Sequence, residues 1–248
     1  MAEPGHERRP DAEPRILFAD EAIVVVDKPP GMPSVPARNP ADPPDVARRL
    51  CGMLPGSDGR PEAVHRLDRD TSGLLLLARS TAARAALGRA FERGLVEKRY
   101  LALVHGAPPA PAGLIHLPIA PDPLRPPAQR PCATVGRRAT SRWITVSAEG
   151  LAEGVTMLEL EPVTGRSHQL RVHMAWLGCP VLGDRLYGDA ARWQGDRLWL
   201  HAARIAFPHP RDGRRMAFLA PLCLDRHAGP GGGGRTLGHP APPLGSGG

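Results

Sequence analysis

The sequence predicts an α+β fold in which a mixed, largely antiparallel sheet is flanked by helices. Short apolar runs bounded by turn-forming or charged residues recur along the chain, and runs of this length are typical of strands. The spacing of an amphipathic helix occurs only over a few short segments between those runs. At 248 residues the chain is also long enough to bury a substantial core.

A single folded domain is expected at residues 14–226. Residues 1–13 are charged, contain Pro and have no periodicity, which predicts a disordered arm. Residues 227–248 are rich in Gly and Pro, which predicts a disordered tail.

In the first part of this domain, strands are expected at 16–18 and 23–26, because these apolar runs flank the polar turn Asp20-Glu21. A short helix is predicted at 45–53. The unbroken apolar run 74–78 predicts a buried strand.

A helix is predicted between Ser80, a favourable N-cap, and Gly94, a typical residue just beyond a helix end. Its apolar face consists of Ala83, Ala86, Leu87, Ala90 and Phe91. A second apolar stripe predicts a helix over 170–177. Further strands are expected at 101–104, 143–146, 155–160, 198–202, 205–207 and 216–219, with 198–202 and 205–207 forming a hairpin.

Residues 107–138 are dense in Pro and include four arginines, Arg125, Arg130, Arg137 and Arg138. Apart from a short apolar patch at 114–119, the segment predicts a long basic excursion from the core. Such a long loop in a compact domain is usually functional or disordered.

The formal charge of +7 and the sequence pI near 10 indicate a polyanionic partner, with nucleic acid first and an anionic membrane second. A general bias towards arginine would produce the same balance. The four cysteines include no C-x-x-C pair, so neither a zinc site nor a disulfide framework is indicated. No secretory leader or membrane span is evident, and a cytoplasmic protein is expected.

A charged loop precedes the apolar run 74–78. Residues 65–73, HRLDRDTSG, place the carboxylates Asp68 and Asp70 among cationic side chains, and Gly73 lets the backbone turn into the strand. Loops on a rigid scaffold are a usual place for catalytic groups, although a charged surface turn would have a similar composition.

A carboxylate near an arginine stays ionised at neutral pH and can serve as a nucleophile, a base or a structural ion-pair partner. The sequence has no metal-ligand cluster, no Ser- or Cys-centred triad pattern and no glycine-rich phosphate motif. An Asp assisted by a Tyr and an Arg remains, and this set suits chemistry at an anomeric carbon. Together with the basic charge, it points to ribose chemistry in a nucleic acid.

Residues 65–73 resemble the signature of the RluA-type pseudouridine synthases, and other motifs of that family occur in order. They are IVVVDKPPG at 23–31, EKRYLA at 97–102, TGRSHQLRVH at 164–173, GCPVLGDRLY at 178–187 and LHA at 200–202. The resemblance covers about 15–221. It implies the family's catalytic fold, with a central cleft between two half-domains, and an RNA pseudouridine synthase that needs no cofactor and no metal.

Within the family, the compact chain most resembles the dual-specificity type. That type modifies both 23S-type ribosomal RNA and the anticodon stem-loop of certain transfer RNAs. The resemblance implies a monomer without the S4 RNA-binding domain found in several relatives. The pair Arg69-Asp70 follows the pattern of the wider family instead, which leaves the RNA target open.

The resemblance also implies roles for single residues. Asp68 would be the catalytic carboxylate, Tyr100 would stack on the target base where the C5 proton is removed, and Arg171 would pair with Asp68. Asp70 competes with Asp68 for the first role, and Arg166 competes with Arg171 for the last. Tyr100 could instead be a core tyrosine.

RNA- or substrate-binding positions are expected at Arg66, His65, Arg166 and Leu200. Arg66 would enter the RNA where the nucleotide flips out, and Leu200 would line the pocket. The histidines 65, 168, 173 and 201 could suggest a metal site, but structural hydrogen bonding is the preferred interpretation. Two other functions stay open: an RNA-binding protein without catalysis, and a nucleoside or glycoside hydrolase, which would normally need a second working carboxylate.

Overall fold

The computed structural model describes residues 12–36, 43–54, 60–146, 151–188, 197–224 and 235–237. The strands of the main sheet are β1 (Arg15–Ala19), β2 (Ile23–Lys28), β3 (Glu62–Ala63), β4 (Ser72–Ala78), β5 (Glu97–His105), β6 (Ala112–His116), β9 (Thr140–Val146), β10 (Val155–Pro162), β11 (Leu200–Pro208) and β12 (Arg215–Leu219).

These ten strands form one sheet in the order β1-β2-β4-β11-β5-β10-β9-β6, with β12 beside β11 and β3 beside β4. The pair β4–β11 is parallel, and the other pairs of this sheet are antiparallel. The predicted α+β fold with a mixed, largely antiparallel sheet is confirmed.

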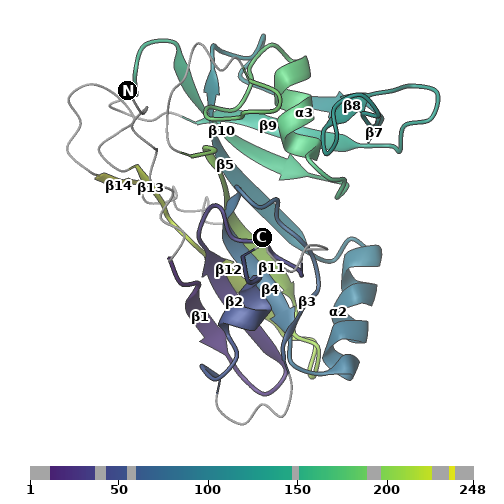
Figure 1. Ribbon diagram of the computed structural model, residues 1–248, viewed down its shortest axis with the longest axis vertical. Coiled ribbons are helices and arrows are strands. Elements are labelled where there is room, and N and C mark those ends of the chain that lie inside the picture. Colours follow the sequence, from purple (N-terminus) through teal and green to yellow (C-terminus); the bar gives the residue numbers. More distant parts are fainter. Residues whose placement is uncertain are drawn as a thin grey trace, which may run out of the picture.

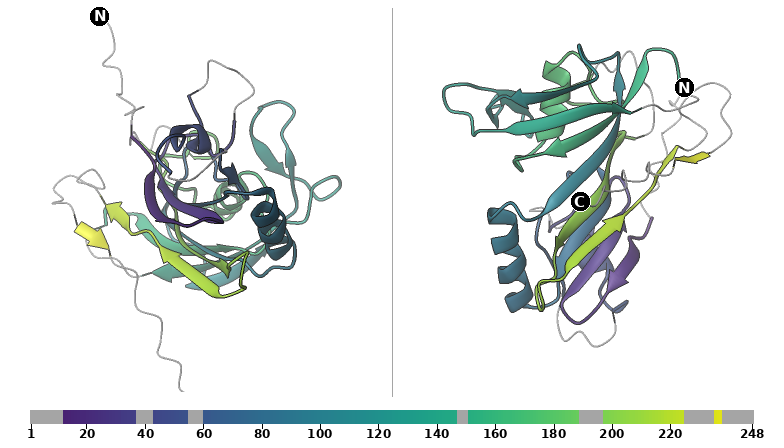
Figure 2. Two further views of the ribbon diagram at one scale, coloured as in Figure 1. Left: turned by 90° about the horizontal axis from the view of Figure 1, so that it is seen from below. Right: turned by 180° about the vertical axis from the view of Figure 1, so that it is seen from behind.

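The helices are α1 (Val46–Arg49), α2 (Thr81–Glu92) and α3 (Gln169–Trp176), and two small antiparallel pairs lie off the main sheet: β7 (Ile119–Pro121) with β8 (Gln129–Pro131), and β13 (Leu222–Leu224) with β14 (Arg235–Leu237). Figure 1 shows two halves, one around β1, β2, β4 and α2, the other around β9, β10 and α3. Strand β5 runs from one half into the other, and the right view in Figure 2 shows the same arrangement from behind.

The helix predicted after Ser80 is confirmed as α2. The Ser80 hydroxyl accepts the Ala83 N–H at 3.1 Å, which satisfies a backbone donor of the first turn. Gly94 has φ of +70°, the left-handed conformation that commonly ends a helix. The buried residues of α2 are Ala83, Leu87 and Ala90, so the expected face packs towards the sheet.

Gly73 permits the close approach of the parallel strands β4 and β11. Its φ is +103°, and a Cβ atom built on it would lie 2.4 Å from the carbonyl oxygen of Ala202. Any other residue would therefore both strain the backbone and clash with β11. This contact lies five residues after Asp68 and brings β11 against the end of the charged loop.

Two sequence-based predictions are wrong. The runs 198–202 and 205–207 do not form a hairpin: residues 200–208 are one strand, β11, whose register against β5 shifts between Ala202 and Arg204. The true hairpin partner of β11 is β12. Residues 107–138 are not a plain loop, because they contain the sheet-edge strand β6 and the pair β7–β8.

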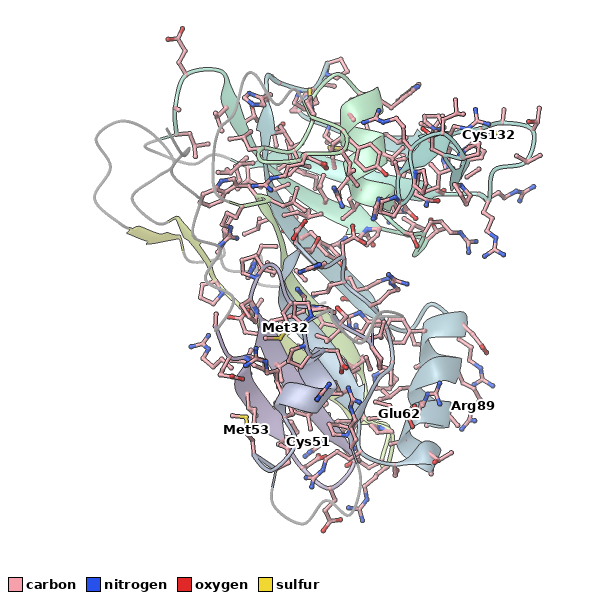
Figure 3. The ribbon with its side chains drawn as sticks, viewed as in Figure 1. Met32, Cys51, Met53, Glu62, Arg89 and Cys132 are labelled. Atoms are coloured by element: carbon pink, nitrogen blue, oxygen red, sulfur yellow. The ribbon has the colours of Figure 1, made fainter. Side chains whose placement is uncertain are left out.

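Other boundaries also differ. The helix expected at 45–53 is shorter, since α1 ends at Arg49, and Asp45 caps its N-terminus. Strand β14 falls inside the segment predicted as a disordered tail; most of that tail, and residues 1–11 of the expected arm, lie outside the described residues. Cys51, Cys132 and Cys179 are free, and Figure 3 shows Cys51 and Cys132 in different halves.

Candidate active site

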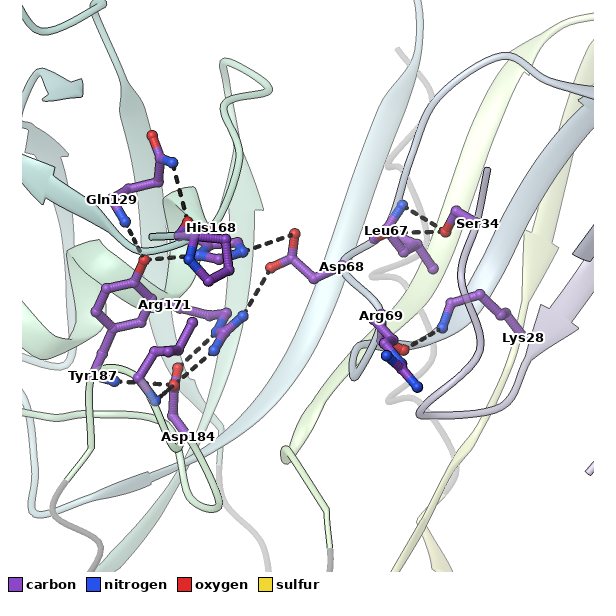
Figure 4. A network of polar contacts seen from close by, with 12 residues as sticks. Lys28, Ser34, Leu67, Asp68, Arg69, Gln129, His168, Arg171, Asp184 and Tyr187 are labelled. Atoms are coloured by element: carbon purple, nitrogen blue, oxygen red, sulfur yellow. Dashed lines mark hydrogen bonds and ion pairs between the residues drawn. The ribbon is translucent and has the colours of Figure 1, made fainter. Parts of the chain in front are cut away.

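Asp68 lies in the loop that leads into β4, and hydrogen bonds hold the backbone on both sides of it (Figure 4). The Ser34 hydroxyl donates to the Leu67 carbonyl oxygen at 2.9 Å and accepts the Leu67 N–H at 3.1 Å. The Arg69 carbonyl oxygen accepts the Lys28 ammonium at 2.9 Å. The chain after β2 therefore sets the backbone position of the residue that carries the carboxylate.

Lys28, at the end of β2, is fully buried. Its ammonium donates to the carbonyl oxygens of Pro29, Met32 and Arg69, each at 2.9 Å, so all three of its protons have an acceptor. Burial nevertheless lowers the pKa of Lys28 from 10.5 to about 7, and nearby carboxylates oppose the shift only in part.

This pKa predicts how stability depends on pH. Between pH 7 and 10.5 the unfolded chain holds a proton on Lys28 that the folded protein has released. The unfolded state thus binds more protons, so the free energy of unfolding should rise with pH across this window. Urea unfolding at several pH values between about 7 and 10 should show the rise in the native protein and a smaller one in Lys28→Met. Parallel curves for the two proteins would contradict the lowered pKa.

Arg171, on α3, approaches Asp68 from the other half of the molecule. Its Nη1 lies 3.4 Å from Asp68 Oδ2, while its Nε and Nη2 donate to the two carboxylate oxygens of Asp184 at 2.7 and 2.8 Å (Figure 4). Burial opposes the guanidinium charge, but Asp184 and Asp68 outweigh it and raise the pKa of Arg171. Arg171 therefore stays cationic and keeps the Asp68 carboxylate aimed.

The three side chains differ in exposure. Arg171 and Asp184 expose 5% and 0% of their side chains, whereas Asp68 exposes 16%. The bidentate contact with Asp184 is thus the buried, structural part of the network. Asp68 is the carboxylate left open to the cavity.

A second chain of contacts reaches Asp68 through His168. The Tyr187 hydroxyl accepts the Gln129 N–H at 2.6 Å and lies 2.7 Å from His168 Nδ1. The hydroxyl thus connects the backbone at Gln129 to the His168 imidazole. His168 Nε2 lies 4.0 Å from Asp68 Oδ1 (Figure 4).

His168 has an unusual backbone conformation. Its φ of +54° is the only positive value for a non-glycine residue in the part of the chain that the structure describes. Strained conformations of this kind cluster at functional sites, where the surrounding structure maintains them. Burial, partly offset by Asp68, lowers the pKa of His168, so the imidazole is neutral at neutral pH.

A cavity of about 260 Å³ lies between the two halves and includes Asp68 in its wall. Tyr100, on β5, is buried in the same wall. Burial, and to a lesser extent the charge of Asp68, raises the pKa of Tyr100. The phenol therefore stays protonated at neutral pH and presents a neutral ring to the cavity.

All seven residues assigned to the site from the sequence line this one cavity: Asp68, Tyr100, Arg171, Arg66, His65, Arg166 and Leu200. Asp70 is exposed and is not among the lining residues. The structure thus brings the assigned residues together from segments far apart in the sequence. Their individual roles stay predictions.

The surroundings of the four expected binding residues differ. Arg66 and Arg166 are exposed at the cavity, and the Arg166 Nε donates to the Arg138 carbonyl oxygen at 3.1 Å. The His65 Nε2 accepts the Leu76 N–H at 3.1 Å, and burial lowers the pKa of His65 to about 3. His65 is therefore a neutral wall residue, and Leu200 is a buried apolar one.

Sequence reasoning missed the residues behind the carboxylate. The segment 178–187 resembles a family motif, but the sequence alone predicts no role for Asp184, which holds Arg171, or for Tyr187, whose hydroxyl contacts His168. Lys98 also lines the cavity and was not assigned a role. All three residues lie inside family motifs, at 97–102 and 178–187, and this position was the one sign in the sequence that they could belong to the site.

Among the described residues, no group of three or more His, Cys, Asp or Glu side chains is arranged to hold a metal ion. None of the helices in the described ranges combines the length and hydropathy needed to cross a membrane.

The sequence matches the family model described as RNA pseudouridylate synthase over residues 22–176. It is 41% identical over 207 residues to the dual-specificity RNA pseudouridine synthase RluA of Escherichia coli K12, covering 83% of this chain and 92% of the relative. The protein of that name from Yersinia pestis is 39% identical over 204 residues, covering 82% of this chain and 96% of the relative.

Solved structures agree with this assignment. Human RNA pseudouridylate synthase domain containing 1 superposes with a TM-score of 0.71 at 27% identity, covering 90% of this chain and 86% of the other. Human RNA pseudouridylate synthase domain containing 4 gives a TM-score of 0.66 at 25% identity, covering 84% and 88%.

Proposed function

Because this chain belongs to the RluA family of RNA pseudouridine synthases, and is thus an isomerase that acts on RNA, we propose that it modifies uridines of 23S-type ribosomal RNA, of the transfer RNA anticodon stem-loop, or of both. The similarity to relatives named dual-specificity enzymes supports this choice of substrates. We further propose that residues 14–226 act as one catalytic domain, as a monomer in the cytoplasm.

The single observation that carries the proposal is the pairing of Asp68 with Arg171 in the cavity that also contains Tyr100. In pseudouridine formation the C1′–N1 bond of uridine breaks, the uracil rotates, and a C1′–C5 bond forms as the C5 proton leaves. An ionised carboxylate can capture C1′ or assist loss of the base, since positive charge develops at this carbon. Arg171, 3.4 Å from the Asp68 carboxylate, holds that carboxylate in position for this step.

The remaining residues serve substrate positioning in this proposal. A uridine stacked in RNA cannot present C1′ and C5 to a cavity, so the nucleotide must flip out, at a cost of a few kcal/mol. Tyr100 supplies a neutral ring on which the flipped base stacks. Arg66 and Arg166, exposed at the cavity, contact the RNA around it.

Tritium release tests the reaction and its target together. Ribosomal and transfer RNA transcripts that carry the label at C5 of uridine would be incubated separately with the native protein. Release without free uracil is expected from at least one of them. The responding RNA identifies the substrate class. Free uracil would indicate a hydrolase, and no release despite RNA binding would support a non-catalytic RNA-binding protein.

RNA binding is expected to weaken steeply with salt, because neutralised phosphates release counterions. With several Arg–phosphate contacts, affinity should fall at least about tenfold between about 50 and 200 mM salt. Arg166→Gln should reduce the slope of log affinity against log salt by about one. Fluorescence anisotropy titrations measure both quantities, and a flat salt dependence would contradict binding through phosphates.

A further inference from the structure

Lys98 lies two residues before Tyr100 on β5. Side chains two apart on a strand point to the same face of the sheet, and both of these line the cavity. Arg99, between them, points to the opposite face, where it forms ion pairs with Glu159 and Glu161. The neighbouring cations on β5 thus have different environments: one is paired outside, and the other faces the cavity.

No carboxylate among the described residues forms an ion pair with Lys98. Its Nζ lies 5.7 Å from the centre of the Phe91 ring, and its charge acts on the neutral His65, whose pKa it helps to lower. Gly165 is close on the other side, where an added Cβ would be 3.9 Å from Nζ. Burial lowers the pKa of Lys98, as expected of a desolvated cation without a partner charge.

The composition of the chain makes this residue unusual. The sequence contains two lysines, Lys28 and Lys98, among 32 Lys and Arg residues. Lys28 donates to the Arg69 carbonyl oxygen in the loop that carries Asp68, and Lys98 lines the cavity together with Tyr100. A compact ammonium with three rotatable donors differs from a planar guanidinium, so these two sites use the properties of lysine in a protein that otherwise relies on arginine.

The other cations that line the cavity are either paired with a carboxylate or exposed to solvent. Arg171 is neutralised by the bidentate contact with Asp184, while Arg66 and Arg166 are exposed to water. A largely desolvated and unpaired charge is unfavourable unless a ligand completes it. Lys98 is therefore the cavity cation that is best placed to pair with negative charge on a substrate.

We propose that Lys98 binds the flipped uracil and balances the negative charge that this base acquires when its glycosidic bond breaks. This inference rests on the proposed function. The electron pair of the C1′–N1 bond leaves with N1 and delocalises onto O2 and O4 of the uracil. Lys98 donates hydrogen bonds to one of these oxygens and transfers no proton. When C5 bonds to C1′, the electron pair of the anion forms the new bond and the base becomes neutral. Loss of the C5 proton to water then returns an electron pair to N1, and N1 takes up a proton from water, so that the product is an isomer of uridine.

The position of Lys98 favours the base over a phosphate as its partner. The ammonium lies on the wall formed with Tyr100, Phe91 and His65, next to the ring on which the base would stack. The exposed Arg66 and Arg166 are better placed for the backbone phosphates. A preorganised donor aimed at developing charge acts on the chemical step more than on binding.

Single-turnover kinetics of the native protein, Lys98→Met and Lys98→Arg test the inference on the RNA that responds to the native enzyme. Lys98→Met should lower the rate constant about 10²-fold, the typical effect of losing one such donor, and leave the RNA dissociation constant within about twofold. Lys98→Arg, which keeps the charge, should regain at least about tenfold of the loss. Arg89→Met, which removes an exposed cation on α2 (Figure 3), should match the native protein.

Thermal unfolding separates this role from a structural one. Removing a half-buried charge that has no ion-pair partner should leave the midpoint of Lys98→Met unchanged or raise it, although activity falls. Three results would overturn the inference: a native rate in Lys98→Met, equal losses in Lys98→Met and Lys98→Arg, or weaker binding at an unchanged rate with a salt slope lower by about one, which indicates a phosphate contact. An inactive native protein would refute the proposed function instead.

Discussion

Replacing Asp68 with asparagine is expected to lower the rate of pseudouridine formation at least about 10³-fold, equivalent to about 4 kcal/mol of transition-state stabilisation. Asparagine has nearly the same shape, so the loop contacts of Leu67 and Arg69 should survive the change. It carries no negative charge, and it can neither capture C1′ nor stabilise positive charge there. RNA binding should therefore persist while tritium release disappears.

Asp70→Asn is the matched control. Asp70 is two residues away and also acidic, but it is exposed and does not line the cavity. This variant should keep native tritium release within about twofold, since surface substitutions away from a site usually have small effects. Activity in Asp68→Asn would refute the assigned carboxylate. Loss in Asp70→Asn alone would assign the role to the other aspartate.

Replacing Arg171 with methionine should both inactivate and destabilise the protein. The variant leaves Asp184, whose side chain is fully buried, without its bidentate partner. An unpaired buried charge of this kind destabilises a fold by about 3–5 kcal/mol. Asp68 also loses the cation that aims it, so tritium release should be lost as well. Urea unfolding measures the first effect, and single-turnover kinetics the second.

The double variant Arg171→Met/Asp184→Asn separates these two effects. The asparagine at 184 removes the orphaned charge but keeps an oxygen that can accept the N–H groups of Leu186 and Tyr187. At least half of the lost stability should return, whereas activity should not, because Asp68 still lacks its partner. A single variant destabilised by less than about 1 kcal/mol would show that the network is not a buried ion pair.

Local signals predicted the parts of the fold that local physics controls. The Ser80 cap, the apolar face and Gly94 lie within 15 residues of one another, and the helix they predict is α2. The wrong hairpin at 198–207 has an equally clear cause. Two apolar runs separated by two residues predict a hairpin, but here the break between them is an irregularity in the pairing of one continuous strand, β11, with β5.

The site was predictable only as far as motifs could identify it. Asp68 and Arg171 are 103 residues apart, and no helical or strand periodicity relates them. Asp184 and Tyr187 lie in a loop and form hydrogen bonds with Arg171 and His168 at α3. These contacts depend on tertiary structure, so local sequence patterns do not predict them. The strand β6 was missed because its segment is rich in Pro, and only pairing with β9 makes it a strand.

The uninterrupted sheet has a mechanical consequence for how this enzyme selects its target. Strands β11, β5 and β10 are hydrogen-bonded neighbours that join the two halves, so the halves cannot rotate like hinged domains without breaking that ladder. The spacing between Asp68 and Arg171 is consequently built in by the fold. The RNA should then supply the deformation, and uridines whose surroundings unstack easily are the expected targets. The ease with which an RNA segment deforms should therefore contribute to the choice of target by this protein.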